Sequence, residues 1–227
     1  MRWRQAAVAL LMMTVAAPAR AQGDGPGLRP HHLTVSSGVT WSAAYDIGDA
    51  TAALRGNGTG ATPPSFTLFK ADSQMNASWA PDLRVAVALT STIAVEAGAM
   101  LSYPHVGMSI SNDPEAKAQV LPGEALRQFQ VDGALTWQLP LHGPRTAPYA
   151  VAGAGYLRQL HEDRMLGESG QVYFAGAGLR YWLRGDAASR SIGLRAEARV
   201  NRRRPGIDFA DANRTFPSVS VSLFAGL

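Results

Sequence analysis

Histidine and acidic residues are the side chains in this sequence whose types suggest catalysis or metal binding. His105, and separately His161-Glu162-Asp163, could serve an acyl hydrolase, in which a histidine activates a serine against an ester. Neither histidine has a serine at a motif spacing, so we predict no catalytic residue and no enzyme activity. The pair His31-His32 could ligate a metal, but adjacent residues on a strand point to opposite faces and no spaced partners accompany them. We therefore predict no metal site and no cofactor.

Two glycine-rich triplets, Gly153-Ala154-Gly155 and Gly176-Ala177-Gly178, contain part of a dinucleotide-binding fingerprint. No third glycine follows at the required spacing, and no helical pattern begins at either triplet. We interpret these small residues as space inside the fold beside Arg180.

Charged residues with a spacing of two form the clearest chemical pattern in the chain. Between residues 191 and 201, Arg195, Glu197 and Arg199 alternate with apolar residues. A period of two predicts a β-strand with one charged and one apolar face. Further charges lie on the polar faces of other strand-like segments: Arg84, Glu96, Asp132 and Arg180. The set is mixed in sign, as buried charges must be if they are to pair.

About eight segments show this alternation and must position the charged residues. We predict strands at 32–41, 83–89, 93–103, 128–138, 148–159, 173–183, 191–201 and 218–227. Residues 42–79 and 104–127 are predicted to be long loops, with a short strand possible at Phe66 to Phe69. Long connections alternate with short ones along the chain, as in a barrel with short turns at one end and longer loops at the other.

The apolar faces are predicted to meet lipid. Charged residues make up 17% of the chain, against about 25% in soluble domains. Aromatic residues gather where the predicted strands end, in two belts: Trp41, Tyr103, Phe129, Tyr156, Tyr173 and Phe216, and Trp137, Tyr181 and Phe224. An arginine facing lipid at the midplane costs roughly 2 to 4 kcal/mol, so Arg195 and Arg199 must point inward. We predict an all-β fold: a closed, antiparallel, up-and-down transmembrane β-barrel of about eight strands, filled by an ionic plug with no open pore.

The first residues predict export. Arg2 and Arg4 precede an apolar run that ends at Ala19-Arg20-Ala21, so residues 1–21 are interpreted as a signal peptide and 22–227 as one barrel domain. Removing three arginines lowers the formal charge from +4 to +1, so the basic composition does not indicate nucleic acid as a partner. The sequence has no cysteine, which excludes disulfides and thiolate metal sites.

The sequence resembles the small outer-membrane barrels of the OmpA/OmpX type. The features that carry the resemblance are the signal peptide, the eight strands, the segment from Leu89 to Gly98, the small-residue strand from Ala152 to Tyr156 and the apolar last strand. The resemblance implies location in the outer membrane of a Gram-negative bacterium and insertion by the barrel assembly machinery through the last strand. The chain departs from that pattern in ending on Leu227 where phenylalanine is usual, and we expect no peptidoglycan-binding domain after the barrel.

The function expected from this pattern is structural or interactive at the cell surface, by a monomer whose partner is the lipid bilayer. Arg202-Arg203-Arg204 could contact lipopolysaccharide phosphates, because guanidinium groups bind phosphate in a bidentate fork. Two alternatives remain open. A soluble periplasmic barrel binding a small apolar ligand would be extracted into buffer without detergent. An outer-membrane lipid-A-type acyl hydrolase would lose fatty-acid release when His105 or His161 is replaced by alanine.

Overall fold

The fold is taken from a computed structural model. It describes residues 28–55, 65–113, 118–140, 143, 145–161, 167–185, 190–204 and 213–227. The predicted signal peptide, residues 1–21, lies outside this part of the chain, so the prediction remains open. Within the described residues, no helix is long and apolar enough to cross a membrane.

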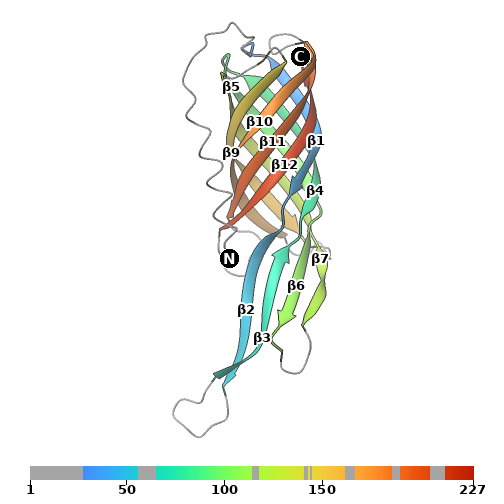
Figure 1. The fold of residues 1–227 in the computed structure, drawn as a ribbon, viewed down its shortest axis with the longest axis vertical. Helices are drawn as coiled ribbons and strands as arrows, with labels where there is room; N and C mark the ends of the chain where they lie inside the picture. The colour runs from blue at the N-terminus through green and yellow to red at the C-terminus, as the bar shows by residue number, and fades with distance from the viewer. Residues whose placement is uncertain are drawn as a thin grey trace.

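Eight strands close into an antiparallel barrel (Figure 1). They are β1 (Leu33–Ser42), β4 (Ser78–Ala88), β5 (Ile93–Ser102), β8 (Arg127–Gln138), β9 (Thr146–Leu160), β10 (Gly167–Arg184), β11 (Ser191–Arg204) and β12 (Arg214–Gly226). The order around the wall is β1-β12-β11-β10-β9-β8-β5-β4, and β1 pairs with both β12 and β4. The prediction of an all-β, closed barrel of about eight antiparallel strands is confirmed.

Side chains alternate strictly between the two faces of the wall. In β11, every second residue from Ser191 to Arg203 is buried, and the residues between them are exposed. Leu194 and Val200 on this strand are more than 40% exposed and face outward, while Arg195, Glu197 and Arg199 face inward. The wall is therefore apolar outside and charged inside, as a strand period of two requires.

Four further strands correct the sequence prediction. β2 (Tyr45–Arg55), β3 (Ser65–Met75), β6 (His105–Ser111) and β7 (Gln119–Ala125) form a second sheet in the order β2-β3-β6-β7. The prediction that 42–79 and 104–127 are loops was wrong, and the possible short strand at Phe66 to Phe69 is part of β3. These strands pair with one another and, in the described chain, with no strand of the wall, so they do not share the wall's strict alternation. We call this sheet the arm.

The arm is an extension of the barrel strands themselves. Only short breaks separate β1 from β2, β3 from β4, β5 from β6, and β7 from β8. Figure 1 shows the arm projecting from one end of the barrel, with the C-terminus at the opposite end. β4 and β8 begin beside the arm strands β3 and β7, so they end at the opposite, C-terminal end of the barrel, where the short connections begin. The predicted alternation of long and short connections holds only in part. The first two long connections are largely strands, and the connection between β9 and β10 spans only residues 161–166, about as many as the short ones.

Apolar clusters lie at both ends of the barrel. At the base of the arm, Ile47, Met75 and Leu126 are fully buried, with Tyr45 and Val106 packed against them; we call this group the neck cluster. Tyr45 also stacks on Phe216, with ring centroids 4.5 Å apart. At the short-turn end, a base cluster is formed by Leu28, Ala88, Ala94, Ala147, Trp182 and Phe224. Phe216 and Phe224 therefore face inward, which corrects their predicted place in the aromatic belts.

Candidate functional site: the ionic interior

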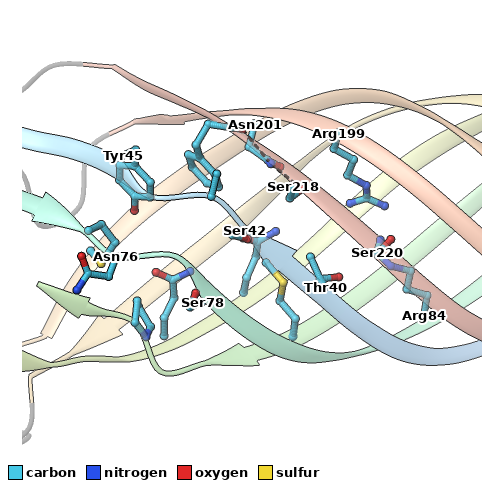
Figure 2. A pocket seen from close by; sticks show the side chains of 17 residues that line it. Thr40, Ser42, Tyr45, Asn76, Ser78, Arg84, Arg199, Asn201, Ser218 and Ser220 are labelled. Atoms are coloured by element: carbon cyan, nitrogen blue, oxygen red, sulfur yellow. Dashed lines mark hydrogen bonds between the residues drawn. The ribbon is translucent and has the colours of Figure 1, made fainter.

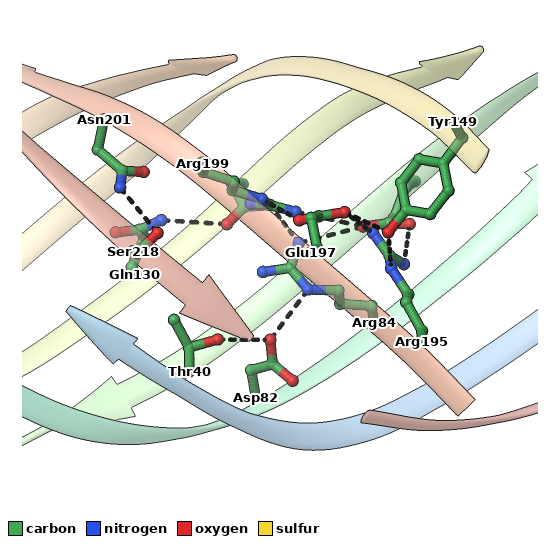
Figure 3. Close-up of polar contacts among 12 residues, drawn as sticks. Thr40, Asp82, Arg84, Gln130, Tyr149, Arg195, Glu197, Arg199, Asn201 and Ser218 are labelled. Carbon is green, nitrogen blue, oxygen red and sulfur yellow. Dashed lines mark hydrogen bonds and ion pairs between the residues drawn. The ribbon is translucent and has the colours of Figure 1, made fainter. Parts of the chain in front are cut away.

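Eight buried charged side chains meet in the middle of the barrel. Figure 3 shows Asp82, Arg84, Arg195, Glu197 and Arg199 among them. All seven residues predicted for the ionic network lie on the inner face, and Asp82 joins them; none is more than 6% exposed. The four positive residues are Arg84, Arg180, Arg195 and Arg199, and the four negative residues are Asp82, Glu96, Asp132 and Glu197. With four charges of each sign, the group is formally neutral, which is the condition for burying charges together.

Glu96 on β5 is held by arginines from two other strands. Arg195 of β11 binds it in a bidentate fork, with Nη1 2.5 Å from Oε2 and Nη2 3.0 Å from Oε1. Arg84 of β4 donates from Nη1 to Oε1 at 3.1 Å, and Arg199 Nη2 lies 3.7 Å from the same oxygen. Bidentate pairs fix orientation as well as charge, so Glu96 ties opposite sides of the barrel together.

Glu197 lies between two arginines of its own strand and a tyrosine from β9. Its Oε2 accepts from Arg195 Nη2 at 2.5 Å and from the Tyr149 hydroxyl at 2.6 Å, and its Oε1 accepts from Arg199 Nε. Tyr149 in turn accepts a hydrogen bond from Arg195 Nε at 2.6 Å. Both carboxylate oxygens are therefore satisfied by donors, as burial requires.

The two aspartates extend the network toward β1 and β8. Asp82 Oδ2 accepts from Arg84 Nε at 3.0 Å and from the Thr40 hydroxyl at 2.9 Å. Asp132 Oδ1 lies 3.5 Å from Arg84 Nη1, and its Oδ2 accepts from Gln130 Nε2 at 3.1 Å. Side chains from β1, β4, β5, β8, β9 and β11 are thus linked by direct polar contacts.

Arg180 on β10 joins the group in a different way. Among the described residues it has no carboxylate within ion-pair distance, and its guanidinium lies 5.0 Å from the ring centroid of Tyr149. Arg195 lies 5.1 Å from the same centroid, and Arg199 lies 4.1 Å from that of Phe174. Arg195 and Arg199 therefore contact aromatic rings in addition to carboxylates, whereas Arg180 contacts a ring alone within the described part of the chain.

Gly178 provides the space that Tyr149 occupies. A Cβ at this position would lie 2.3 Å from the Tyr149 hydroxyl oxygen and 2.4 Å from the ring carbon that bears it. The glycine-rich segment of β10 was predicted to make room beside Arg180, and the structure places a tyrosine ring in that room, with Arg180 over it. A side chain larger than hydrogen at 178 must displace the ring from the centre of the network.

Two members of the network were missed from the sequence. Asp82 lies two residues before Arg84 and so shares its face, but the predicted strand began one residue later, at Leu83. Tyr149 lies on a strand whose two faces both carry small residues, so its direction could not be assigned. Extending the charged alternation of β4 by one step would have found the aspartate.

A small polar cavity separates the ionic network from the neck cluster (Figure 2). About 20 Å³ is open to the centres of water molecules, which is room for one or two waters. Arg84, Arg199, Asn201 and the hydroxyls of Thr40, Ser218 and Ser220 line it. Arg199 Nη2 has no hydrogen-bond partner, so a water in this cavity is the natural one.

The arginine triplet is divided between the two faces of β11. Arg203 points inward, is buried, and donates to the Tyr45 hydroxyl at 2.6 Å and to Gln159. Arg202 and Arg204 point outward and are exposed. The expectation that Arg202, Arg203 and Arg204 form one loop cluster was therefore wrong, because β11 continues three residues beyond its predicted end.

The histidines considered for catalysis or metal binding lie outside the ionic network. His161 Nδ1 is 3.0 Å from Glu124 Oε1 of the arm, and His105 is exposed at the start of β6. His31 has a φ of 64°, and Glu162 and Asp163 lie outside the described residues. In the part of the chain that the structure describes, no group of three or more His, Cys, Asp or Glu could hold a metal ion.

Comparison with protein-family models and with curated proteins finds no match. Among solved structures, the chain is similar to the outer membrane protein OprG from Pseudomonas aeruginosa, at 12% sequence identity and a TM-score of 0.49. That alignment covers 90% of this chain and 99% of OprG.

Proposed function

We propose that the chain is an outer-membrane β-barrel protein of a Gram-negative bacterium, with a closed, ionic interior and with the arm presented for contacts at the cell surface. The observation that carries the proposal is the outer face of the wall. Large apolar side chains are exposed there on every barrel strand except β9, which presents Tyr156, while the charges of the middle of the barrel point inward. Water outside the wall would make this arrangement unfavourable, whereas hydrocarbon outside makes it necessary.

Exposed aromatic residues also indicate that lipid surrounds the wall. Trp79, Tyr103, Phe129, Tyr156 and Tyr173 are exposed on the outer face toward the arm, and Trp137 and Tyr181 toward the short turns. Two such belts are typical of the interfaces of a membrane-spanning barrel. Because longer connections face the exterior in such barrels, the arm would lie outside the cell.

The contents of the barrel favour a plug over a pore. From the short-turn end to the arm, the lumen holds the base cluster, the ionic network, a cavity sized for one or two waters, and the neck cluster. The interior of an eight-stranded barrel is just wide enough for side chains to fill, and the side chains of these groups fill it. We infer that the protein does not conduct ions.

The arm is the region we propose for contacts with partners. Its edge strands, β2 and β7, each pair on one side only, and apolar side chains such as Leu54, Leu121 and Val120 (82% exposed) lie on it. We also propose that the barrel assembly machinery inserts the protein and that the protein is a monomer. A monomer is expected because barrel closure already pairs every wall strand.

The two alternatives receive less support. A soluble barrel holding an apolar ligand needs apolar residues toward its cavity, and here arginines and carboxylates occupy the middle of the lumen. For the acyl hydrolase, His161 contacts the carboxylate of Glu124, but in the described chain no side-chain hydrogen bond joins His105 or His161 to a serine. We expect His105→Ala and His161→Ala to leave fatty-acid release from membrane lipids unchanged.

Three measurements test the proposal. The folded protein should require detergent for extraction and show heat-modifiable mobility on a gel. It should give no steps of conductance in a planar lipid bilayer. Extraction into buffer alone would contradict the membrane position, and regular single-channel steps would contradict the plug.

A further inference from the structure

Three arginines converge on the outer face of the barrel at the arm end. Arg158 lies on β9, and Arg202 and Arg204 lie on β11, all exposed and directed outward. The strand between them is β10, where Arg158 pairs with Ser169, Gln171 with Arg204, and Tyr173 with Arg202. At about 4.8 Å between strands and about 3.4 Å per residue, the Cα atoms of Arg158 and Arg204 are roughly 12 Å apart.

The surface between the arginines is polar and uncharged. The Tyr156 hydroxyl is 2.6 Å from Ser169 Oγ, and the Tyr173 hydroxyl donates to Gln171 at 2.8 Å. The described outward positions of β8–β12 in this region hold no Asp or Glu, and the exposed Glu168 lies on the other face of β10. These outward positions are Arg127, Phe129, Tyr156, Arg158, Leu160, Gly167, Ser169, Gln171, Tyr173, Arg202, Arg204, Thr215 and Pro217. Nothing among them neutralises the three guanidinium groups.

The guanidinium groups remain available for a ligand. In the described chain, neither Arg158 nor Arg202 forms an ion pair or a side-chain hydrogen bond, and Arg204 uses only its Nε, toward Asn213 at 2.8 Å. Arg127 adds positive charge nearby, although its guanidinium lies over the ring of Tyr103, 5.7 Å from the centroid. The region is therefore a concentrated positive patch with free donors.

The tyrosines fix the depth of the patch in a membrane. Rings with an apolar body and a polar tip settle at the level of lipid head groups, and both tyrosine hydroxyls meet the polar residues beside the arginines. Arg158, Arg202 and Arg204 then lie where lipid phosphates lie. This part of the wall therefore faces the lipid head groups and their phosphates.

We propose that Arg158, Arg202 and Arg204 bind the phosphates of a glycolipid of the outer leaflet that carries two phosphate groups. Guanidinium groups hold phosphate bidentately. Three guanidinium groups carry three positive charges, whereas one phosphate carries at most about two negative charges, so the patch matches a head group with two phosphates. Arg158 binds one phosphate, and Arg202 with Arg204 binds the other. This inference rests on the proposed membrane position.

A lipid-binding measurement in detergent tests the site. The probes are a diphosphorylated glycolipid of the lipid A type, the same lipid after phosphate removal, and phosphatidylglycerol, each followed by native mass spectrometry. The wild-type protein should retain the diphosphorylated lipid most strongly. Arg158→Gln, Arg202→Gln and Arg204→Gln together should weaken its binding by about tenfold or more, because each loses charge-assisted hydrogen bonds.

The matched control removes three exposed arginines from the opposite end of the barrel, by Arg145→Gln, Arg184→Gln and Arg190→Gln. This variant should bind as the wild type does. Equal binding by the two triple variants, equal binding of the dephosphorylated lipid, or equal binding of phosphatidylglycerol would each overturn the site. Heat-modifiable mobility, measured on the same samples, separates the two proposals: a folded membrane barrel without lipid preference contradicts the site alone, whereas a detergent-independent protein contradicts both.

Discussion

Glu96 and Glu197 are the residues on which the interior depends. Each is buried and accepts from two or more donors, so the arginines around them are compensated only while both carboxylates are present. Removing one partner of a buried ion pair costs about 3 to 5 kcal/mol, because the remaining charge stays buried without compensation. Removing a carboxylate from the surface changes stability far less, because water solvates the charges there.

Glu197→Ala therefore should lower the free energy of unfolding by roughly 3 to 5 kcal/mol, since Arg195 and Arg199 lose a shared acceptor. Urea titration in lipid vesicles, with heat-modifiable mobility as the readout, measures the change. Glu168→Ala, at an exposed residue, is the control and should change stability by less than about 0.5 kcal/mol. An unchanged stability in Glu197→Ala would indicate that water, not protein, solvates the arginines.

Gly178→Ala should also destabilise the barrel, by about 1 to 3 kcal/mol, because the new methyl group collides with the Tyr149 ring. Gly133→Ala is the matched control: a Cβ at Gly133 meets nothing within 4 Å, so this variant should unfold at the wild-type urea concentration. Equal midpoints for the two variants would show that the Tyr149 ring can move away from Arg180 and Glu197 without loss of stability.

The faces of the charged residues were predictable, whereas their partners were not. The cost of an arginine in lipid is large enough to decide the direction of Arg195 and Arg199 from the alternation alone. That Tyr149 lies among them depends on contacts between β9, β10 and β11, which no pattern within one strand encodes. The inward direction of Arg203 is not evident from the sequence, because a run of arginines hides the period of two.

At the scale of the element, barrel strands and arm strands differ in what their sequences must satisfy. A strand in the wall has packed side chains on its inner side and, in our proposal, lipid on its outer side, so its alternation is strict, as in β11. A strand of the arm has no such requirement, and for that reason the sequences of β2, β3, β6 and β7 resemble loops. The number of wall strands was therefore predictable, and the arm was not.

Leu135→Arg tests the lipid-facing side of a wall strand. Leu135 is 57% exposed on β8, between the aromatic residues Phe129 and Trp137. In lipid the substitution should lower the free energy of unfolding by about 1 to 3 kcal/mol, because the penalty for an arginine is largest at the midplane and falls toward the belt that holds Trp137. Urea titration in vesicles measures the change.

Val120→Arg is the control for this change, because Val120 is even more exposed but lies on the arm. It should leave stability within about 0.5 kcal/mol of the wild type. If Leu135→Arg were equally harmless, the outer face of β8 would be in contact with water.

At the scale of the whole molecule, the barrel is a closed support for the arm. Both ends of the lumen are filled by apolar side chains and its middle by ion pairs and hydrogen bonds that link six strands, so the wall cannot flatten without breaking buried contacts. Four of the wall strands continue directly into the arm. A rigid barrel therefore fixes where the arm's edge strands and exposed apolar side chains are presented.

If hydrocarbon surrounds the wall, spin labels on its outer face should report it in lipid vesicles. The sequence has no cysteine, so single cysteines at Leu135, Leu179 and Val221, and at Val120 on the arm, can each carry one label. The three wall positions should be relaxed strongly by oxygen, which concentrates in lipid, and weakly by a water-soluble nickel chelate, with the reverse at Val120. Relaxation by the nickel chelate at Leu135, Leu179 and Val221 as strong as at Val120 would contradict the account.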